Sequence, residues 1–396
     1  MNPIVRKIVF SICTTTIFFT AVELYLRHIQ FEGTSIADLI DTAGFPDNSY
    51  VHKRDRIMGS WFLETSNGYR SNPVLRQRGF HKETFLKIEK RIFAMGGSTT
   101  YGSPFENQER GFPHRLQKSL NSRLRIINVG VAGMDSSAFP AMSKELSAIG
   151  AEGIIIYTGN NEIRGSLLSM CSPQQHLFAN IKIYQWIQDR YRKSSGFQYS
   201  YNQLAQHQED CILTSLTTIT DQIENPESTN RSDQLYTGLL SSFTNNVSTA
   251  IENFINEQIH VFLVIPPINL YQNPEYSYKG VTNPSAIEKL ERNKEWNRII
   301  ELIPNHAMAN FKMGLRTNDL TLLRRAAEYD YASRRITPSL QEALMETCQK
   351  YEKDVTCIDM RYIEENDAKR FFVDFCHPTF DFGVNSIVES ILSHIE

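Results

Sequence analysis

The chain has 396 residues, a formal net charge of -3 and hydrophobic residues at 41% of its positions. This length and apolar content are enough for one large domain or two ordinary ones with a real core. Because lysines and arginines are scattered and the net charge is close to neutral, the composition excludes nucleic acid as an expected partner.

An apolar segment at the N-terminus predicts a membrane anchor over residues 1–27. Arg6 and Lys7 precede it, and from Ile8 to Leu26 it is close to the roughly 20 residues that a helix needs to cross a bilayer. The basic residues predict a single-pass orientation in the cytoplasmic (inner) membrane, with the main domain on the periplasmic side. The threonines of the segment make it a poor span, so a cleaved signal peptide and a buried helix stay open as alternatives.

Residues 28–90 form a polar lead-in, in which Gly59–Phe62 and Gly68–Ser71 are expected to be short strand or turn pieces. Beyond it, apolar runs have the length of strands: Arg91–Met95, Arg125–Val131, Gly153–Thr158, His260–Ile265 and Val355–Met360. Apolar runs without alternation are typical of parallel strands that are covered on both faces.

Helical spacing of apolar residues predicts helices between and after these strands, at Phe112–Arg123, Leu239–Glu257 and Phe382–Ile395. The alternation predicts one three-layer α/β/α sandwich over residues 91–396, with a central parallel sheet of about five strands. Helical insertions at about 164–240 and 268–345 are expected to shape a pocket. The second insertion should hold helices at Ile287–Leu302 and Leu320–Tyr331, joined by an irregular stretch, and the first carries aromatic residues that could stack on sugars: Tyr184, Trp186, Tyr199 and Tyr201.

The first candidate site residue, Ser98, lies in the segment Gly96–Gly102 directly after the first strand. Two glycines before a serine allow a sharp turn that lifts the hydroxyl above the edge of the sheet. A turn that caps a helix or binds a phosphate is the alternative. The segment lacks the lysine of a P-loop and the third glycine of a dinucleotide-binding fingerprint.

Asp374 and His377 near the C-terminus supply what a nucleophilic serine needs. Histidine is suited to remove the hydroxyl proton, and an aspartate can hold the imidazole in the required tautomer. A spacing of three lets both side chains meet on one turn, and Pro378 makes a helix through His377 unfavourable. The alternative is a surface Asp and His beside the start of a helix.

An oxyanion hole requires several donors that point at one position. Asn161 offers a side-chain amide after the third strand, Gly133 offers a backbone N–H, and Ser98 offers its own backbone N–H. Asn160 is a second amide beside Asn161, so the assignment is open by one residue.

Together, these blocks resemble the SGNH (GDSL-type) hydrolase superfamily, in the order Gly96–Thr99, Asn128–Gly133, Gly159–Glu162 and Asp374–His377. The resemblance implies a flavodoxin-like fold in which Ser98, Gly133, Asn161 and His377 are the family residues and Asp374 completes the triad. Gly97 stands where the family name has Asp, and Thr99 where it has Leu. The sequences of Gly96–Gly102 and Tyr157–Glu162 are similar to those of a bacterial, N-terminally anchored branch of the superfamily. We therefore interpret these two differences as typical of that branch.

The resemblance implies a serine hydrolase of the SGNH/GDSL esterase type, which cleaves an O-acyl group from a carbohydrate or lipid through an acyl-enzyme on Ser98. It implies no metal and no organic cofactor. The expected partners are the small-molecule or glycan/lipid acyl ester and, through the N-terminal helix, the membrane. An O-acyltransferase that uses the same site and a catalytically inactive carbohydrate-binding scaffold are the alternative functions.

The sequence contains six cysteines, of which Cys13 lies in the apolar N-terminal segment. Export from the cytoplasm would permit disulfides. One arrangement pairs Cys348 with Cys357 and Cys171 with Cys211, which leaves Cys376 free, and the alternative is that all are reduced. No cysteine or histidine spacing is typical of a zinc site.

Overall fold

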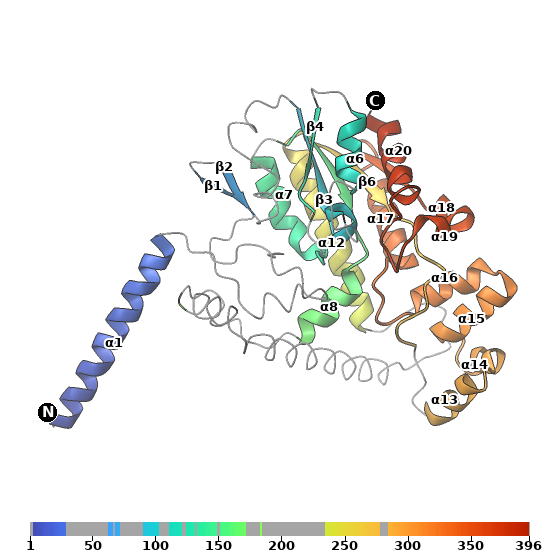
Figure 1. The fold of residues 1–396 in the computed structure, drawn as a ribbon, viewed down its shortest axis with the longest axis horizontal. Helices are drawn as coiled ribbons and strands as arrows, with labels where there is room; N and C mark the ends of the chain where they lie inside the picture. The colour runs from blue at the N-terminus through green and yellow to red at the C-terminus, as the bar shows by residue number, and fades with distance from the viewer. Residues whose placement is uncertain are drawn as a thin grey trace.

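A parallel five-stranded sheet forms the centre of the protein in the computed structural model of the chain (Figure 1). The structure describes residues 3–28, 62–65, 68–71, 90–102, 111–120, 124–130, 133–148, 151–171, 183, 234–277 and 284–395. The strands are β3 (Lys90–Gly96), β4 (Leu124–Asn128), β5 (Gly153–Tyr157), β6 (His260–Ile265) and β7 (Val355–Asp359). These five strands confirm the predicted runs, with β4 ending at Asn128 rather than at Val131.

The order of the strands across the sheet is β4-β3-β5-β6-β7, and every neighbouring pair is parallel. The chain therefore leaves the first strand of the sheet, β3, toward one side for β4 and crosses to the other side for β5. In doubly wound sheets, ligands bind outside the carboxyl ends of the strands at such a reversal. The turns that begin at Gly97 and Thr158 lie at this position.

Helices cover both faces of the sheet and complete the predicted three-layer sandwich. They are α6 (Phe112–Ser119), α7 (Phe139–Ala148), α12 (Gln234–Asn256), α17 (Pro338–Lys350) and α20 (Gly383–Ile395) (Figure 1). Because side chains alternate along a strand, each face has its own core. Phe93 and Ile154 belong to the core with α7, α12 and α17, whereas Ala94 and Ile155 belong to the core with α6 and α20.

The predicted helix boundaries need several corrections. Helix α6 ends at Ser119 rather than at Arg123, and α7 was not predicted. Helix α17 starts inside the segment predicted as an insertion, which was expected to end at about residue 345, and it packs on β6 and β7. Outside the second insertion, the described residues also form the short helices α5 (Ser98–Tyr101), η2 (Ser136–Ala138), α8 (Glu162–Cys171), α18 (Tyr362–Asn366) and α19 (Ala368–Phe371).

The second insertion is more helical than predicted. It contains α13 (Pro284–Arg292), α14 (Trp296–Leu302), α15 (Ala307–Thr317) and α16 (Leu320–Glu328). The helix expected over Ile287–Leu302 is broken because Lys294 adopts φ 59°, a left-handed conformation that ends a helix. The stretch expected to be irregular contains α15, whose first turn is capped by the side chain of His306 and which ends at Asn318 in the left-handed region. The aromatic residues noted in the first insertion lie outside the described residues.

The N-terminal segment forms helix α1 (Pro3–His28), which stands away from the sheet (Figure 1). No helix in the described part of the chain, α1 included, combines the length and the apolar character that a membrane span requires. The predicted transmembrane helix is thus not shown for this segment, in which hydroxyl side chains and Glu23 interrupt the apolar sequence. In the lead-in, β1 (Phe62–Thr65) pairs antiparallel with β2 (Gly68–Ser71), which confirms a strand at Gly68–Ser71.

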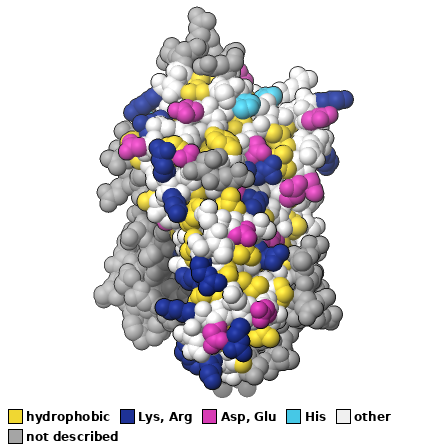
Figure 2. Space-filling view, turned by 90° about the vertical axis from the view of Figure 1, so that its right-hand side faces the viewer, with side chains coloured by type: hydrophobic (Ala, Val, Ile, Leu, Met, Phe, Trp, Pro, Cys, Tyr) yellow, Lys and Arg dark blue, Asp and Glu magenta, His cyan; other side chains and the backbone are white. Residues whose placement is uncertain are grey.

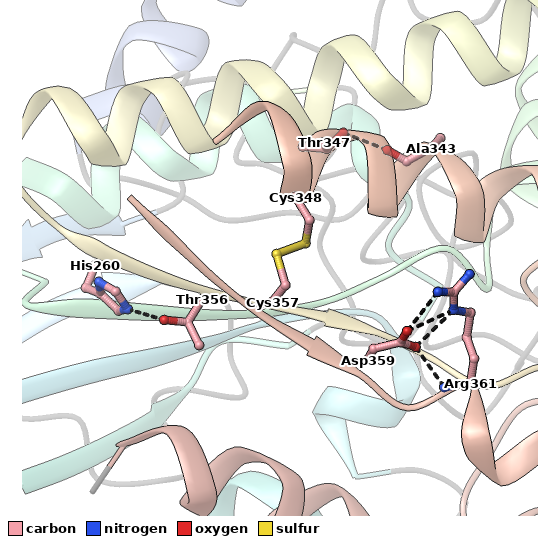
Figure 3. Close-up of a disulfide and its surroundings, with 8 residues drawn as sticks. All are labelled: His260, Ala343, Thr347, Cys348, Thr356, Cys357, Asp359 and Arg361. Atoms are coloured by element: carbon pink, nitrogen blue, oxygen red, sulfur yellow. Dashed lines mark hydrogen bonds and ion pairs between the residues drawn. A yellow bond between two sulfur atoms is a disulfide. The ribbon is translucent and has the colours of Figure 1, made fainter. Parts of the chain in front are cut away.

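One disulfide links α17 to β7, where Cys348 is bonded to Cys357 (Figure 3). This is one of the two bridges in the predicted arrangement. Cys376 is free and buried, as that arrangement has it. The other predicted bridge involves Cys211, which lies outside the described residues.

Figure 2 shows one face of the molecule, on which Lys and Arg side chains are interspersed with Asp and Glu side chains. Charges of both signs so close together cancel over short distances, so this face produces no extended field of one sign.

Candidate active site

Ser98 is the first residue of α5, in a tight turn directly after β3. The turn is closed by the bond from the N–H of Tyr101 to the carbonyl oxygen of Gly97, at 3.0 Å. Gly96 has φ 157°, and a Cβ there would lie 2.1 Å from the carbonyl oxygen of Tyr157 at the end of β5. Glycine is thus required for the turn to pack against the neighbouring strand end.

Asn128, the last residue of β4, holds this turn from the other side. Its side-chain amide donates to the carbonyl oxygen of Thr100 at 2.6 Å, and its Oδ1 accepts from the N–H of Gly130 at 2.9 Å. The sequence indicated Asn128 only as the first residue of a block. The signal for its role was an asparagine at a strand end beside a glycine.

His377 lies between the serine and the aspartate, as predicted. Its Nε2 is 2.8 Å from Oγ of Ser98, and its Nδ1 is 2.7 Å from Oδ2 of Asp374. A carboxylate can only accept, so Nδ1 carries the proton and Nε2 is left to accept from the serine hydroxyl. Ser98 is 5% exposed and His377 is 2% exposed, so both side chains are buried.

Asp374 is held by the turn on which it lies. Its Oδ1 accepts from the N–H groups of Cys376, at 3.0 Å, and His377, at 2.8 Å. Burial raises the pKa of the Asp374 carboxyl, but the hydrogen bond and the charge of His377, with the two N–H groups, outweigh it and lower the pKa overall. The aspartate is therefore kept ionised beside the imidazole.

The loop after β6 also reaches this turn, a contact that sequence reasoning missed. The side-chain amide of Asn269 donates to the carbonyl oxygen of Asp374. The carbonyl oxygen of Asn269 in turn accepts from the buried guanidinium of Arg335, which also bonds to the carbonyl oxygen of Gln272 at 2.8 Å. The position of Asn269 soon after a strand end was the available signal, but nothing in the sequence pairs it with Arg335.

Three segments converge where the oxyanion donors were predicted. Nδ2 of Asn161 donates to the carbonyl oxygen of Met134 at 3.0 Å, next to Gly133, which has φ 76°. A Cβ built on Gly97 would lie 2.4 Å from that Nδ2 and 3.2 Å from the Met134 oxygen. The amide of Asn161, the 133–134 segment and the backbone before Ser98 are therefore in mutual contact. The same approach explains glycine rather than aspartate at position 97, since any Cβ would displace the Asn161 amide.

The two adjacent asparagines have different contacts. Oδ1 of Asn160 accepts from the N–H of Ile336 at 2.9 Å, so this side chain is directed at the second insertion. Gly159, with φ 109°, makes the turn and leaves room for the Ile336 side chain. Asn161 is the residue that contacts the serine turn, as assigned from the sequence.

Cys376 is a neutral thiol beside the serine. Burial raises the pKa of the Cys376 thiol well above its usual value, the charge of Asp374 raises it further, and a hydrogen bond with Ser98 acts in the opposite direction. Asp374, Cys376 and His377 are the one group of potential metal ligands among the described residues. Both ring nitrogens of His377 in this group are already hydrogen-bonded, Nδ1 to Asp374 and Nε2 to Ser98.

No protein-family model matches the chain, and no curated protein matches it by sequence. Solved structures similar to it include an acetyl xylan esterase, with 10% identity over 77% of this chain and 100% of that chain and a TM-score of 0.36. A lipase/acylhydrolase from Enterococcus faecalis has 13% identity over 77% of this chain and 95% of that chain, with a TM-score of 0.37. A lipolytic protein of the G-D-S-L family from Desulfitobacterium hafniense has 12% identity over 77% of this chain and 99% of that chain, with a TM-score of 0.31.

Proposed function

We propose that the protein is a serine hydrolase that cleaves an ester through an acyl-enzyme on Ser98. The observation that carries this proposal is the chain of hydrogen bonds from Ser98 through His377 to Asp374, at 2.8 and 2.7 Å. A serine hydroxyl is a weak nucleophile until a neighbouring base takes its proton, and this geometry provides the base and the group that orients it.

In the first step, Oγ of Ser98 attacks the ester carbonyl carbon while its proton moves to Nε2 of His377. The imidazolium that forms is stabilised by the carboxylate of Asp374, which stays ionised. His377 then gives the proton to the alcohol oxygen as the bond to the acyl carbon breaks. Water, activated by the same histidine, attacks the acyl-enzyme and releases the acid.

The negative charge on the carbonyl oxygen develops beside Asn161. The side-chain amide of Asn161 and the backbone N–H groups of Ser98 and Gly133 are the donors that we assign to it. The contact of Asn161 with Gly97 and Met134 supports this assignment, because Gly97 precedes Ser98 and Met134 follows Gly133. Donors fixed in this way need no reorganisation when the charge appears.

The substrate that we propose is an O-acyl group on a carbohydrate or a lipid. The resemblance of the four sequence blocks to SGNH hydrolases supports an ester as the bond that is cleaved. The rates of hydrolysis of p-nitrophenyl acetate and of p-nitrophenyl esters with longer acyl chains, and then of acetylated oligosaccharides, would rank these candidate substrates. If the protein reacts with serine-directed inhibitors but hydrolyses none of these oxygen esters, this choice of substrate is contradicted.

We also propose that the catalytic domain acts outside the cytoplasm, on the periplasmic side. The disulfide between Cys348 and Cys357 supports this location, since disulfides persist in oxidising compartments. Alkylation of free thiols in acid-quenched cells should leave both cysteines unmodified. Complete alkylation of both in the native protein would contradict the proposal.

The test of the hydrolase is labelling with a fluorophosphonate probe, combined with ester turnover. The parent chain should be labelled, and Ser98→Ala should lose the label together with at least about a thousand-fold of turnover. Ser137→Ala is the matched control, because Ser137 is an exposed serine on the neighbouring η2 segment. Equal labelling of the parent and Ser98→Ala would refute Ser98 as the nucleophile.

A further inference from the structure

Glu162 is the first residue of α8 and directly follows the oxyanion candidate Asn161. Its side chain is buried, with 5% of the residue exposed, although a glutamate at the start of a helix is ordinarily on the surface. The catalytic chain Ser98–His377–Asp374 does not use it. A buried carboxyl next to an active site therefore needs an explanation in its own contacts.

The contacts of Glu162 are with the segment that follows Gly133. Oε1 accepts from the N–H of Ser136 at 3.0 Å, and Oε2 lies 2.8 Å from the hydroxyl of the same serine. Asn246 on α12 donates to that hydroxyl at 3.4 Å. The Ser136 hydroxyl thus joins the carboxyl to the helix layer behind it.

The preceding residue, Asn161, binds the same segment two positions earlier. Its Nδ2 donates to the carbonyl oxygen of Met134, so the first turn of α8 holds the segment at Met134 and at Ser136. Gly165, one turn further along α8, gives independent evidence of this approach. A Cβ on Gly165 would lie 2.4 Å from Oδ2 of Asp135.

We propose that Glu162 is a positioning residue, which fixes the Gly133–Ser136 segment against Asn161 and so keeps the oxyanion donors together. The inference rests on the proposed function, since it assigns Gly133 and Asn161 to the oxyanion. Glu162 itself does not touch the reacting atoms. Its effect passes through Ser136 to the backbone that carries the Gly133 N–H.

The ionisation of Glu162 gives this role a pH dependence. Burial, reinforced by the charge of Asp135, raises the pKa of Glu162 to about 8, although hydrogen bonds from Ser136 and Thr158 lower it. Asp135 is the titratable neighbour that acts on this carboxyl among the described residues, and Asn246 on α12 and Thr158 after β5 are neutral. Above that pH, Glu162 carries a buried negative charge beside Asp135 and near the assigned oxyanion position. This charge repels the negative charge that develops on the substrate oxygen, so it destabilises the transition state.

The experiment compares Glu162→Ala and Glu162→Gln with the parent, using kcat per active site titrated with the fluorophosphonate. Glu162→Ala should lower kcat by about ten- to a hundred-fold with less than about a three-fold change in KM, because a displacement of about 1 Å can cost about a hundred-fold. Glu162→Gln keeps the shape of the protonated carboxyl and should recover most of the loss at pH 7. The kcat of the parent should decline above pH 8, where Glu162 ionises, and Glu162→Gln should lack this decline.

Titration of active sites separates positioning from folding, since misfolded chains are not counted. A parental kcat per site in Glu162→Ala, or the same alkaline decline in Glu162→Gln as in the parent, would overturn the positioning role. Failure of the proposed function would be visible separately, as a parent chain that neither reacts with the probe nor turns over esters.

Discussion

The two halves of the candidate site are built in different ways. The acid–base half is local, since Asp374 and His377 lie on one turn and Asp374 accepts from two N–H groups of that turn. The oxyanion half is assembled from three segments, which follow β3, β4 and β5 and meet at Gly97, Met134 and Asn161. Local hydrogen bonds orient the carboxylate and the imidazole of the first half, with one added contact from Asn269, whereas the second half depends on how three strand ends are aligned.

This difference predicts different kinds of sensitivity. Chemical changes to its own side chains should disable the acid–base half. The oxyanion half should respond also to small steric changes at residues that carry no reactive group. Substitutions in each half, matched with nearby controls, can break or sharpen the comparison.

The largest effect is expected in the acid–base half, from Asp374→Asn. The amide cannot hold His377 with Nδ1 protonated, so Nε2 is no longer free to accept from Ser98, and kcat should fall by about 10⁴-fold with the fold unchanged. Asp359→Asn is the control, because Asp359 is an exposed aspartate at the end of β7 that pairs with Arg361 (Figure 3). A loss below ten-fold for Asp374→Asn would show that Asp374 does not orient the histidine.

A smaller loss is expected in the oxyanion half, from Asn161→Ala. Removal of one oxyanion donor costs about 10²- to 10³-fold in kcat and leaves substrate binding nearly unchanged. Asn160→Ala is a matched control at the next position, where the lost contact is with the buried N–H of Ile336. That variant should lower the free energy of unfolding and change kcat little. Equal kcat losses in the two variants would refute the assignment of Asn161.

The sequence predicted the parts of the protein that local pattern determines. The five strands are short runs that are mostly apolar. Ser98, Asn161, Asp374 and His377 each occur in a short recognisable block, so the fold and the candidate site residues could be predicted from the chain itself. The polar contacts that hold the site did not follow. Asn269 with Arg335, and Glu162 with Ser136, are pairs of residues far apart in sequence whose meeting depends on the tertiary fold.

The same reason explains the errors in the second insertion. The break between α13 and α14 depends on one residue, Lys294, which adopts a left-handed conformation. Because this residue is not a glycine, the sequence gives no signal for the break. Helix α15 carries a mixed composition and begins at a buried histidine cap, His306, whose contribution requires the folded surroundings. Apolar spacing indicates helices that face a core, and it is less informative for short helices in an insertion.

The smallest change in structure, one added methyl group, tests the comparison most directly. Gly97 has φ -80°, outside the left-handed region that favours glycine, so the main change in Gly97→Ala is the contact that its Cβ makes. Its Cβ would lie 2.4 Å from Nδ2 of Asn161, and the end of a side chain can move away at little cost to stability. We therefore expect kcat to fall by about ten- to a hundred-fold while the melting temperature stays within about 2 °C of the parent.

Gly238→Ala in α12 is the control, because a Cβ there meets nothing within 4 Å and should only favour the helix. Active-site titration with the fluorophosphonate should give the same number of reactive serines in both variants, since His377 and Asp374 are untouched. A Gly97→Ala enzyme with parental kcat would mean that the position of the Asn161 amide does not limit turnover. The oxyanion half would then tolerate displacement as well as the acid–base half does, and the contrast between them would fail.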